Sequence, residues 1–142
     1  MVSKLRGWQK PNCQFIVLRD QDSGDCKNIK AFLKQKCIEG NHPEALVRFA
    51  CHELESWYLG DLSAVEQGLE IRGLSKHQKR SKFRDPDLVI NPSKVLLKIT
   101  KGNYQKVSGS RNIGSYLSAQ KNQSVSFQFF SQGLVKFWQE GQ

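Results

Sequence analysis

Two aspartates one residue apart, Asp20 and Asp22, are the first residues of this chain that suggest chemistry. They directly follow an apolar run over residues 15–18 that is typical of a buried strand, and the turn formers Ser23 and Gly24 come next. Strands of an open α/β sheet deliver their carboxyl ends to the edge where ligands bind. Because two close carboxylates repel each other unless a cation compensates, the pair predicts a site for a hard divalent ion such as Mg²⁺ or Mn²⁺.

The same segment also has a purely structural interpretation. Aspartates that follow a strand form turns and cap helices, and Asp22, Ser23 or Asp25 is placed to cap a helix that begins near Cys26. An EF-hand is disfavoured, because a loop counted from Asp20 lacks the glycine at position six and the glutamate at position twelve.

A strand–helix–strand unit should position these aspartates. Residues 26–38 carry apolar side chains at helical spacing, with lysines on the opposite side, and Gly40 and Pro43 end the pattern. The short apolar run 45–50 predicts a second buried strand, parallel to the first. Residues 52–69 then turn helical again.

Two glutamates follow this second strand. Glu53 and Glu55 should approach the aspartates of the neighbouring strand tip, since the carboxyl ends of parallel strands share one edge. Acids in the first turn of a helix also complement the helix dipole, so a structural role is the alternative.

The balance of charge favours a polyanionic partner. The chain has 22 Lys and Arg against 13 Asp and Glu, a formal net charge of +9, and such an excess attracts nucleic acid through phosphate contacts. Residues 75–84 concentrate this charge around His77 and Phe83, a pattern that can follow a phosphate backbone and stack on a base. A solvated loop, or a surface that docks on an acidic protein, is the alternative.

The last third should be mainly helical. Pro92 predicts the start of a helix, and residues 113–120 and 126–140 predict two more, after a glycine- and serine-rich stretch. The final helix repeats large apolar side chains every three or four residues, which predicts a core face. These side chains are Phe127, Phe130, Leu134 and Trp138.

Length and composition predict one globular domain over residues 1–142. No run approaches the ~20 apolar residues of a membrane span, and the first thirteen residues lack the apolar stretch of a signal peptide. We therefore expect a soluble, cytoplasmic protein. Its four cysteines show no CxxC spacing, which favours reduced, packed thiols over disulfides or zinc.

Five blocks along the chain resemble, in order, a toprim-like family of uncharacterised bacterial proteins that is linked to ATPase genes and to phage defence. The blocks are FIVLRDQDSGDC, LVRFACHELESWYLGDL, DPDLVINP, YQKVSGSR and SVSFQFF. This resemblance implies an α/β fold of toprim (Rossmann-like) type, with a partly parallel sheet flanked by helices and a helical C-terminal part.

The resemblance also implies roles for individual residues. Asp20 and Asp22 look like the magnesium ligands of toprim domains, which perform phosphodiester chemistry. Glu53 and Glu55 look like the acids that the nuclease branch adds for a second ion, with Glu55 as a ligand, and Lys106 would steady the scissile phosphate. Divalent ions suit this chemistry because they clamp the phosphate oxygens and neutralise developing charge.

One departure from the family pattern weakens the expectation of strong nuclease activity. The toprim glutamate follows an earlier strand, but only about a dozen residues precede the apolar run, and none of them is Glu. We therefore expect that the chain lacks the family's N-terminal part. Such a loss would expose one face of the sheet and favour a homodimer, a partner chain or low stability.

The sequence thus predicts a metal-dependent, nuclease-like domain with nucleic acid and an ATPase as partners. The rival is a non-catalytic module that binds nucleic acid or protein and uses its acids structurally. The residues expected to bind nucleic acid are Lys76, Lys79, Arg80, Lys82, Arg84 and Arg111.

Overall fold

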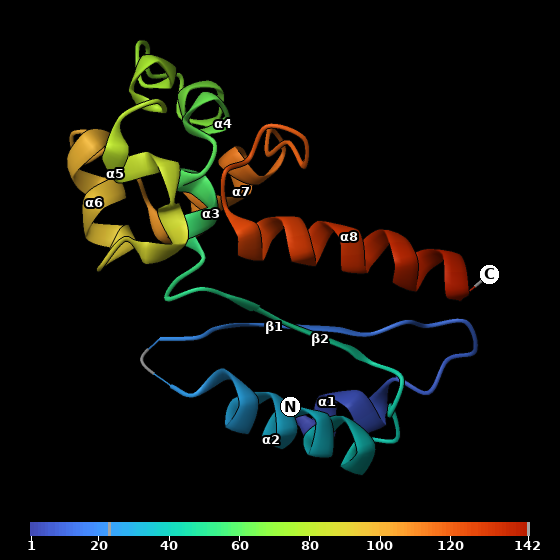
Figure 1. The fold of residues 1–142 in the computed structure, drawn as a ribbon. Helices are drawn as coiled ribbons and strands as arrows, with labels where there is room; N and C mark the ends of the chain where they lie inside the picture. The colour runs from blue at the N-terminus through green and yellow to red at the C-terminus, as the bar shows by residue number, and fades with distance from the viewer. Residues whose placement is uncertain (23, 142) are drawn as a thin grey trace.

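Two short strands form the centre of the N-terminal half of the molecule (Figure 1). The computed structural model describes residues 1–22 and 24–141. Strand β1 (Ile16–Asp20) pairs in parallel with β2 (Leu46–Ala50), and their last residues lie opposite each other. The predicted parallel pair is confirmed, and both strands end at the same edge.

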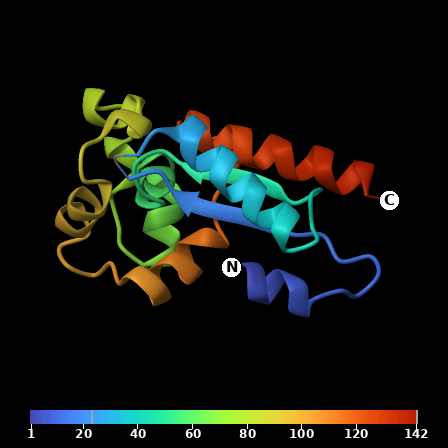
Figure 2. The same cartoon turned by 90° about the horizontal axis from the view of Figure 1, so that it is seen from below.

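Helix α2 (Cys26–Glu39) connects the two strands and buries Leu33 and Cys37 against them. Its N-cap is Asp25, whose carboxylate accepts a hydrogen bond from the backbone N–H of Lys27 at 2.8 Å. The short helix α1 (Val2–Gly7) packs beside α2. In Figure 1 the last helix of the chain lies on the opposite side of the sheet from α2, and Figure 2 shows the same layers from the side of α2.

This last helix, α8 (Val125–Glu140), packs on β2. Phe127 and Phe130 contact the ring of Trp57, with ring centroids 5.2 and 4.8 Å away. The predicted core face is therefore correct at its beginning. It is wrong at Trp138, which is 65% exposed because the helix extends past the layer that β2 provides.

The second half of the chain folds into a helical lobe that caps the carboxyl edge of the sheet (Figure 1). One hydrophobic cluster, centred on Leu59, Leu62, Leu96 and Ile113, holds the lobe together. Its helices are α3 (Glu55–Leu59), α4 (Leu62–Gly68), the 3₁₀ turn η1 (Ser75–His77), α5 (Ser81–Arg84), the 3₁₀ turn η2 (Pro86–Leu88), α6 (Pro92–Ile99) and α7 (Lys106–Gly114).

The single helix predicted over residues 52–69 is wrong, because the chain breaks at Gly60 and Asp61. The Asp61 carboxylate caps α4 by accepting from the N–H of Ala64 at 3.1 Å, and it also accepts from the N–H of Ser118 at 3.0 Å. These two hydrogen bonds satisfy a carboxylate that is only 4% exposed, and a continuous helix would leave it without them.

The helix predicted over residues 113–120 is also wrong, since α7 ends at Gly114 and begins seven residues earlier than expected. Gly109 allows α7 to pack closely against Tyr104. It is buried, and the Cβ of any other residue there would lie 2.8 Å from a ring carbon of Tyr104. Packing of Gly109 and Ile113 thus outweighs the low helix propensity of the glycine- and serine-rich stretch.

Two simpler expectations concern the cysteines and the membrane. All four cysteines are free thiols, with Cys37 fully buried and Cys26 exposed. Among the helices of residues 1–22 and 24–141, none has the length and apolar character needed to cross a bilayer.

Candidate functional site

Backbone pairing continues beyond the ends of the two strands and brings the predicted acids together. The N–H of Gln21 donates to the carbonyl of Ala50 at 3.0 Å, and the N–H of Asp22 donates to the carbonyl of His52 at 2.8 Å. Asp22 and His52 both adopt left-handed backbone conformations, with φ of 52° and 58°. This conformation is strained for a residue with a Cβ, and such strain is common at ligand sites.

The carboxylate of Asp20 lies at the centre of this edge. Its Oδ1 accepts a hydrogen bond from the backbone N–H of Leu54 at 2.8 Å, which ties β1 to the start of α3. Burial raises the pKa of Asp20 above its ordinary value, and the negative charges of Glu55, Asp22 and Glu53 raise it further. Asp20 is therefore close enough to the other three predicted acids to feel their charges.

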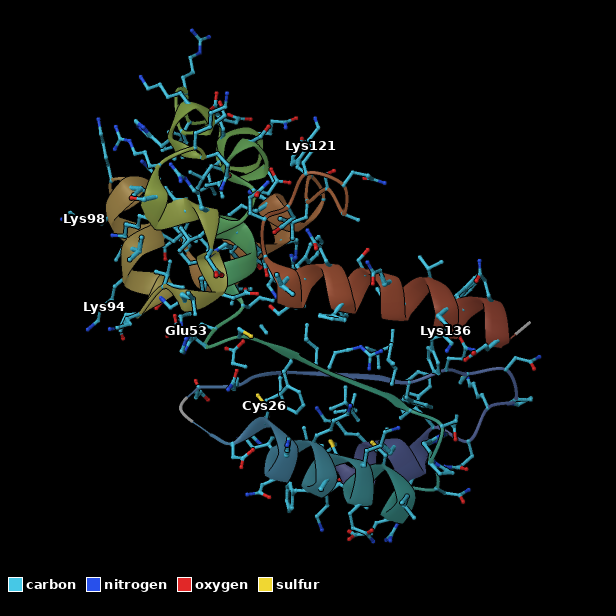
Figure 3. All side chains as sticks on the ribbon, viewed as in Figure 1. Cys26, Glu53, Lys94, Lys98, Lys121 and Lys136 are labelled. Atoms are coloured by element: carbon cyan, nitrogen blue, oxygen red, sulfur yellow. The ribbon has the colours of Figure 1, made fainter. Side chains whose placement is uncertain are left out.

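The two glutamates are held by hydrogen bonds from the helical lobe. Oε2 of Glu53 accepts from the N–H of Ser93 at 2.8 Å and so caps α6 in place of the side chain of Asn91. Oε1 of Glu55 accepts from the hydroxyl of Tyr104 at 2.8 Å, although Glu55 is only 4% exposed. Figure 3 shows Glu53 where the sheet meets the helical lobe.

A group of hydroxyl side chains extends this polar site into the lobe. Burial raises the pKa of Tyr104 well above its ordinary value, and Glu55 adds to the effect. The Tyr104 oxygen also lies 3.0 Å from Oγ of Ser110. Burial likewise raises the pKa of Tyr58, whose ring centre is 6.1 Å from that of Tyr104. Both tyrosines thus remain protonated hydrogen-bond donors beside the acids.

No cation neutralises these acids within the described part of the chain. The ion pairs of residues 1–22 and 24–141 lie elsewhere, on α2, beside α2 and on α8, and none brings a Lys, Arg or His nitrogen within 4.0 Å of the four carboxylates. In those residues, no three His, Cys, Asp or Glu side chains converge closely enough to form a metal cage. The site is therefore an acidic cluster with uncompensated charge rather than a preformed cage.

Lys106, the residue expected to steady a phosphate, is the first residue of α7. It lines a cavity of about 360 Å³ together with Ser93 and Tyr104, whose N–H and hydroxyl bind Glu53 and Glu55. Lys94 lines the same cavity and was not predicted from the sequence.

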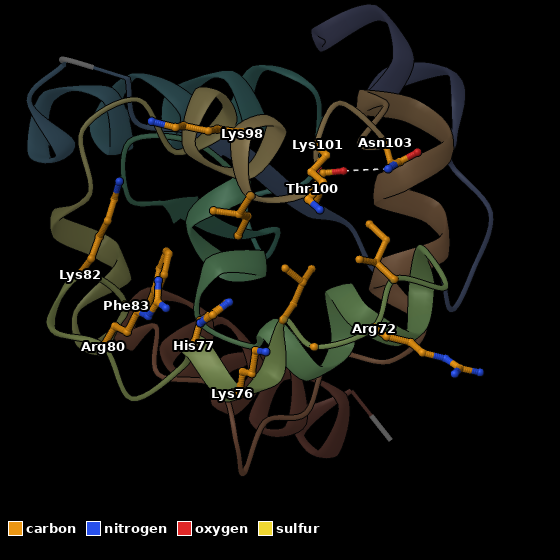
Figure 4. Close-up of a pocket in the computed structure, with 14 residues that line it drawn as sticks. Arg72, Lys76, His77, Arg80, Lys82, Phe83, Lys98, Thr100, Lys101 and Asn103 are labelled. Carbon is orange, nitrogen blue, oxygen red and sulfur yellow. Dashed lines mark hydrogen bonds between the residues drawn. The ribbon is translucent and has the colours of Figure 1, made fainter.

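The basic stretch forms one wall of a second, larger cavity of about 550 Å³ (Figure 4). Lys76, Arg80 and Lys82 were predicted and line it. Three further basic residues that also line it were missed, because they lie outside the basic stretch in sequence: Arg72, Lys98 and Lys101.

The structure does not bring the remaining predicted basic residues into either cavity. Lys79 and Arg84 are exposed on the outside of this wall, where Nε of Arg84 donates to the carbonyl of Lys79 at 3.3 Å. Arg111 is exposed on α7, more than one helical turn beyond Lys106.

Comparison with known proteins identifies a family but no function. The model of the family described as "Domain of unknown function (DUF4276)" matches residues 2–135. No curated protein matches the chain. No solved structure matches it either.

Proposed function

The chain belongs to this family of unknown function, and we propose that it is a divalent-metal-dependent, nuclease-like domain of toprim type that acts on nucleic acid. One observation carries the proposal. Asp20, at the carboxyl edge of a parallel sheet, feels the charges of Asp22, Glu53 and Glu55. Within residues 1–22 and 24–141 none of the four has a cationic partner, although the chain has a net charge of +9. Uncompensated oxygen ligands at such an edge suit a hard divalent ion.

Asp20 and Asp22 would hold the ion, and Glu55 would become a third protein ligand only after turning away from Tyr104. Magnesium commonly binds one or two carboxylates and keeps several waters, so a complete protein cage is unnecessary. The bound ion would supply charge neutralisation at the phosphate. Asp22 is the most accessible of the acids, whereas Glu55 is turned toward Tyr104.

Other side chains would position the ligands of the ion or bind the phosphate. Tyr104 donates to Glu55 and fixes the orientation of its carboxylate. Glu53 holds the start of α6 beside the site. Lys106 and Lys94 flank the adjacent cavity and offer positive charge to a phosphate there.

A non-catalytic binding module is the second candidate, and a specific observation favours it. Each of three acids already accepts a hydrogen bond that ties two elements together, namely Asp20 from Leu54, Glu53 from Ser93 and Glu55 from Tyr104. These contacts would account for the acids without any metal. In this candidate the basic cavity alone would bind nucleic acid or an acidic partner.

A cleavage assay separates the two candidates. Labelled single- and double-stranded DNA and RNA would be incubated with the protein, with Mg²⁺, Mn²⁺ or EDTA. We expect cleavage that requires the metal and that falls at least a hundredfold in Asp20→Asn, because the amide keeps the hydrogen bond from Leu54 but loses the charge.

Asp85→Asn is the matched control, since it removes an exposed carboxylate whose side chain caps no helix. It should cleave like the wild type. Wild-type protein that binds nucleic acid but shows no metal-dependent cleavage would favour the binding module. Equal cleavage by wild type and Asp20→Asn would exclude the assigned metal site.

The resemblance of the five sequence blocks extends this proposal to an ATPase partner and a role in phage defence. Co-expression with a neighbouring ATPase gene, followed by affinity purification, tests the ATPase partner.

The apolar residues exposed around β1, among them Trp8 (55%) and Ile16 (46%), make a homodimer the further expectation. Sedimentation equilibrium measures it, and a monomer at all concentrations would contradict it.

A further inference from the structure

The larger cavity has an unusual balance of charge. Six exposed Lys and Arg side chains and His77 surround it, and no Asp or Glu belongs to its lining. Partial burial lowers the pKa of His77, and the positive charges of Arg80 and Lys76 lower it further. Glu66 is an acid beside this lining, where its Oε2 accepts a hydrogen bond from the N–H of Ser75 at 2.7 Å, so the cations outnumber the carboxylate. Like charges in such excess repel one another, and a bound polyanion relieves this repulsion.

The interior of this cavity is apolar as well as basic. Phe83 and Leu74 are 4% and 6% exposed, and they line it together with Ile71 and Ile99. Figure 4 shows His77 and Phe83 between the flanking basic side chains. A site for phosphate alone needs no apolar surface. A site for a nucleotide needs cations for the phosphate and an apolar surface for the base, which stacks on apolar and aromatic groups.

The concave shape argues for a single strand rather than a duplex. In a duplex the bases are stacked and paired, so a convex backbone would contact only the rim of a hollow of about 550 Å³. An unpaired base of a single strand can enter such a hollow.

Helix α6 connects this cavity to the acidic cluster. Its first turn meets the cluster, where the N–H of Ser93 binds Glu53, and the chain just beyond its last turn lines the basic cavity. Lys94 and Lys98 lie one turn apart on one side of α6, as Figure 3 shows, and Lys101 lies just past the end of the helix, where its φ is 51°. The path along the eight residues of α6 is about 12 Å, at about 1.5 Å per residue.

We propose that the basic cavity binds one phosphate and its unpaired base in a single-stranded nucleic acid, and that the backbone continues over Lys98 and Lys94 to the acidic cluster. This inference rests on the proposed function for what happens at the cluster. It assigns the strand a fixed anchor about 12 Å from the cluster, at the far end of α6.

Binding in EDTA tests the anchor without any metal or cleavage. Fluorescence anisotropy would follow labelled eight-nucleotide single strands, of DNA and of RNA, and a hairpin duplex of equal charge. We expect the single strands to bind at least tenfold more tightly than the duplex. In Lys98→Gln/Lys101→Gln, the slope of log K against log salt should fall by about 1.4, or about 0.7 for each lost phosphate contact.

Lys27→Gln/Lys136→Gln is the matched control, because it removes the same charge from exposed positions on α2 and α8. It should keep the wild-type slope. Circular dichroism establishes that each variant is folded. Equal slopes for the two double variants, or equal affinity for duplex and single strand, would overturn the proposal.

Strand length tests the path along α6. A dinucleotide should occupy only the cavity, so Lys94→Gln should bind it like the wild type but bind the eight-nucleotide strand several-fold more weakly. An equal loss for both lengths would contradict the path. Asp20→Asn should bind the dinucleotide and the eight-nucleotide strand at least as tightly as the wild type. If this variant binds but does not cleave, the defect lies in the acidic cluster and not in the basic cavity.

Discussion

The hydroxyl of Tyr104 donates a hydrogen bond to Oε1 of Glu55 at 2.8 Å, although the two residues are 49 positions apart in the sequence. Both residues are buried. This hydrogen bond fixes the start of α3 to the segment that precedes α7. It also orients one of the four acids of the strand edge. Its loss should therefore affect both the stability of the lobe and the arrangement of the site.

Tyr104→Phe should lower the free energy of unfolding by about 1–3 kcal/mol, because Glu55 would be left buried without its donor. Urea denaturation followed by circular dichroism measures the change. The matched control is Tyr116→Phe, which removes a hydroxyl from a tyrosine that is 49% exposed. If both variants lost the same stability, the buried hydrogen bond would have no special importance.

Asp20→Asn should stabilise the protein at neutral pH. The pKa of Asp20 is raised in the folded protein by burial and by Glu55, so ionisation costs more there than in the unfolded chain. Stability should thus fall as pH rises from the ordinary carboxyl value near 3.8 through the raised pKa. The asparagine variant loses this dependence while keeping an acceptor for Leu54.

Melting temperatures across pH 3.5–8 measure this effect. The variant should melt above the wild type at pH 7, and the difference should shrink toward the acid end of the range. Glu140→Gln, which changes an exposed carboxylate on α8, should show no such pH-dependent difference. A constant difference between Asp20→Asn and wild type at every pH would mean that ionisation of Asp20 is not its cause.

Magnesium should raise the melting temperature of the wild type and leave that of Asp20→Asn unchanged. A ligand that binds only the folded state stabilises it by about 2.7 kcal/mol at a hundredfold excess over its Kd. Calorimetric titration with MgCl₂ and MnCl₂ measures the same interaction directly, with calcium as a test of selectivity. If the folded wild type released or absorbed no heat of binding and its melting temperature did not change with metal, the metal site would be excluded.

Gly68→Ala should destabilise the helical lobe. A Cβ at Gly68 would lie 2.7 Å from the backbone N and Cα of Ile113, so α4 and α7 would have to separate. We expect a loss of about 1–3 kcal/mol, measured by urea denaturation. Gly114→Ala is the contrasting variant, because its Cβ would meet no atom within 4 Å and should be neutral or mildly stabilising. Similar losses in both variants would show that helix propensity, not the α4–α7 contact, governs them.

The strand-end acids could be found from the sequence because their placement depends on local pattern. An apolar run, a helical period and a second apolar run determine which residues follow each strand, and the parallel pairing then brings Asp20 close to Glu53 and Glu55. Asp25 was likewise one of three caps that the sequence allowed, and it is the one the structure uses.

Contacts between distant segments could not be found in this way. The sequence pattern makes Asp61 one more polar residue of an amphipathic helix, and it gives no sign that the carboxylate accepts a hydrogen bond from the distant N–H of Ser118 as well as capping α4. Arg72, Lys98 and Lys101 lie apart in sequence and share a cavity only after α6 folds back beside η1. The local periodicity of a sequence carries no information about contacts between residues that are distant in sequence.

The placement of α8 also determines the order in which the molecule can be completed during synthesis. This helix is made after β2 and the helical lobe, yet it packs on β2, and its start is tied to Asp87 through Ser124 and Ser126. At about 5–20 residues per second, the ribosome needs roughly 5–20 s to proceed from β2 to the end of α8. During that interval one face of the nascent sheet has no helix of its own chain to cover it, and it is then open to chaperones and to other chains.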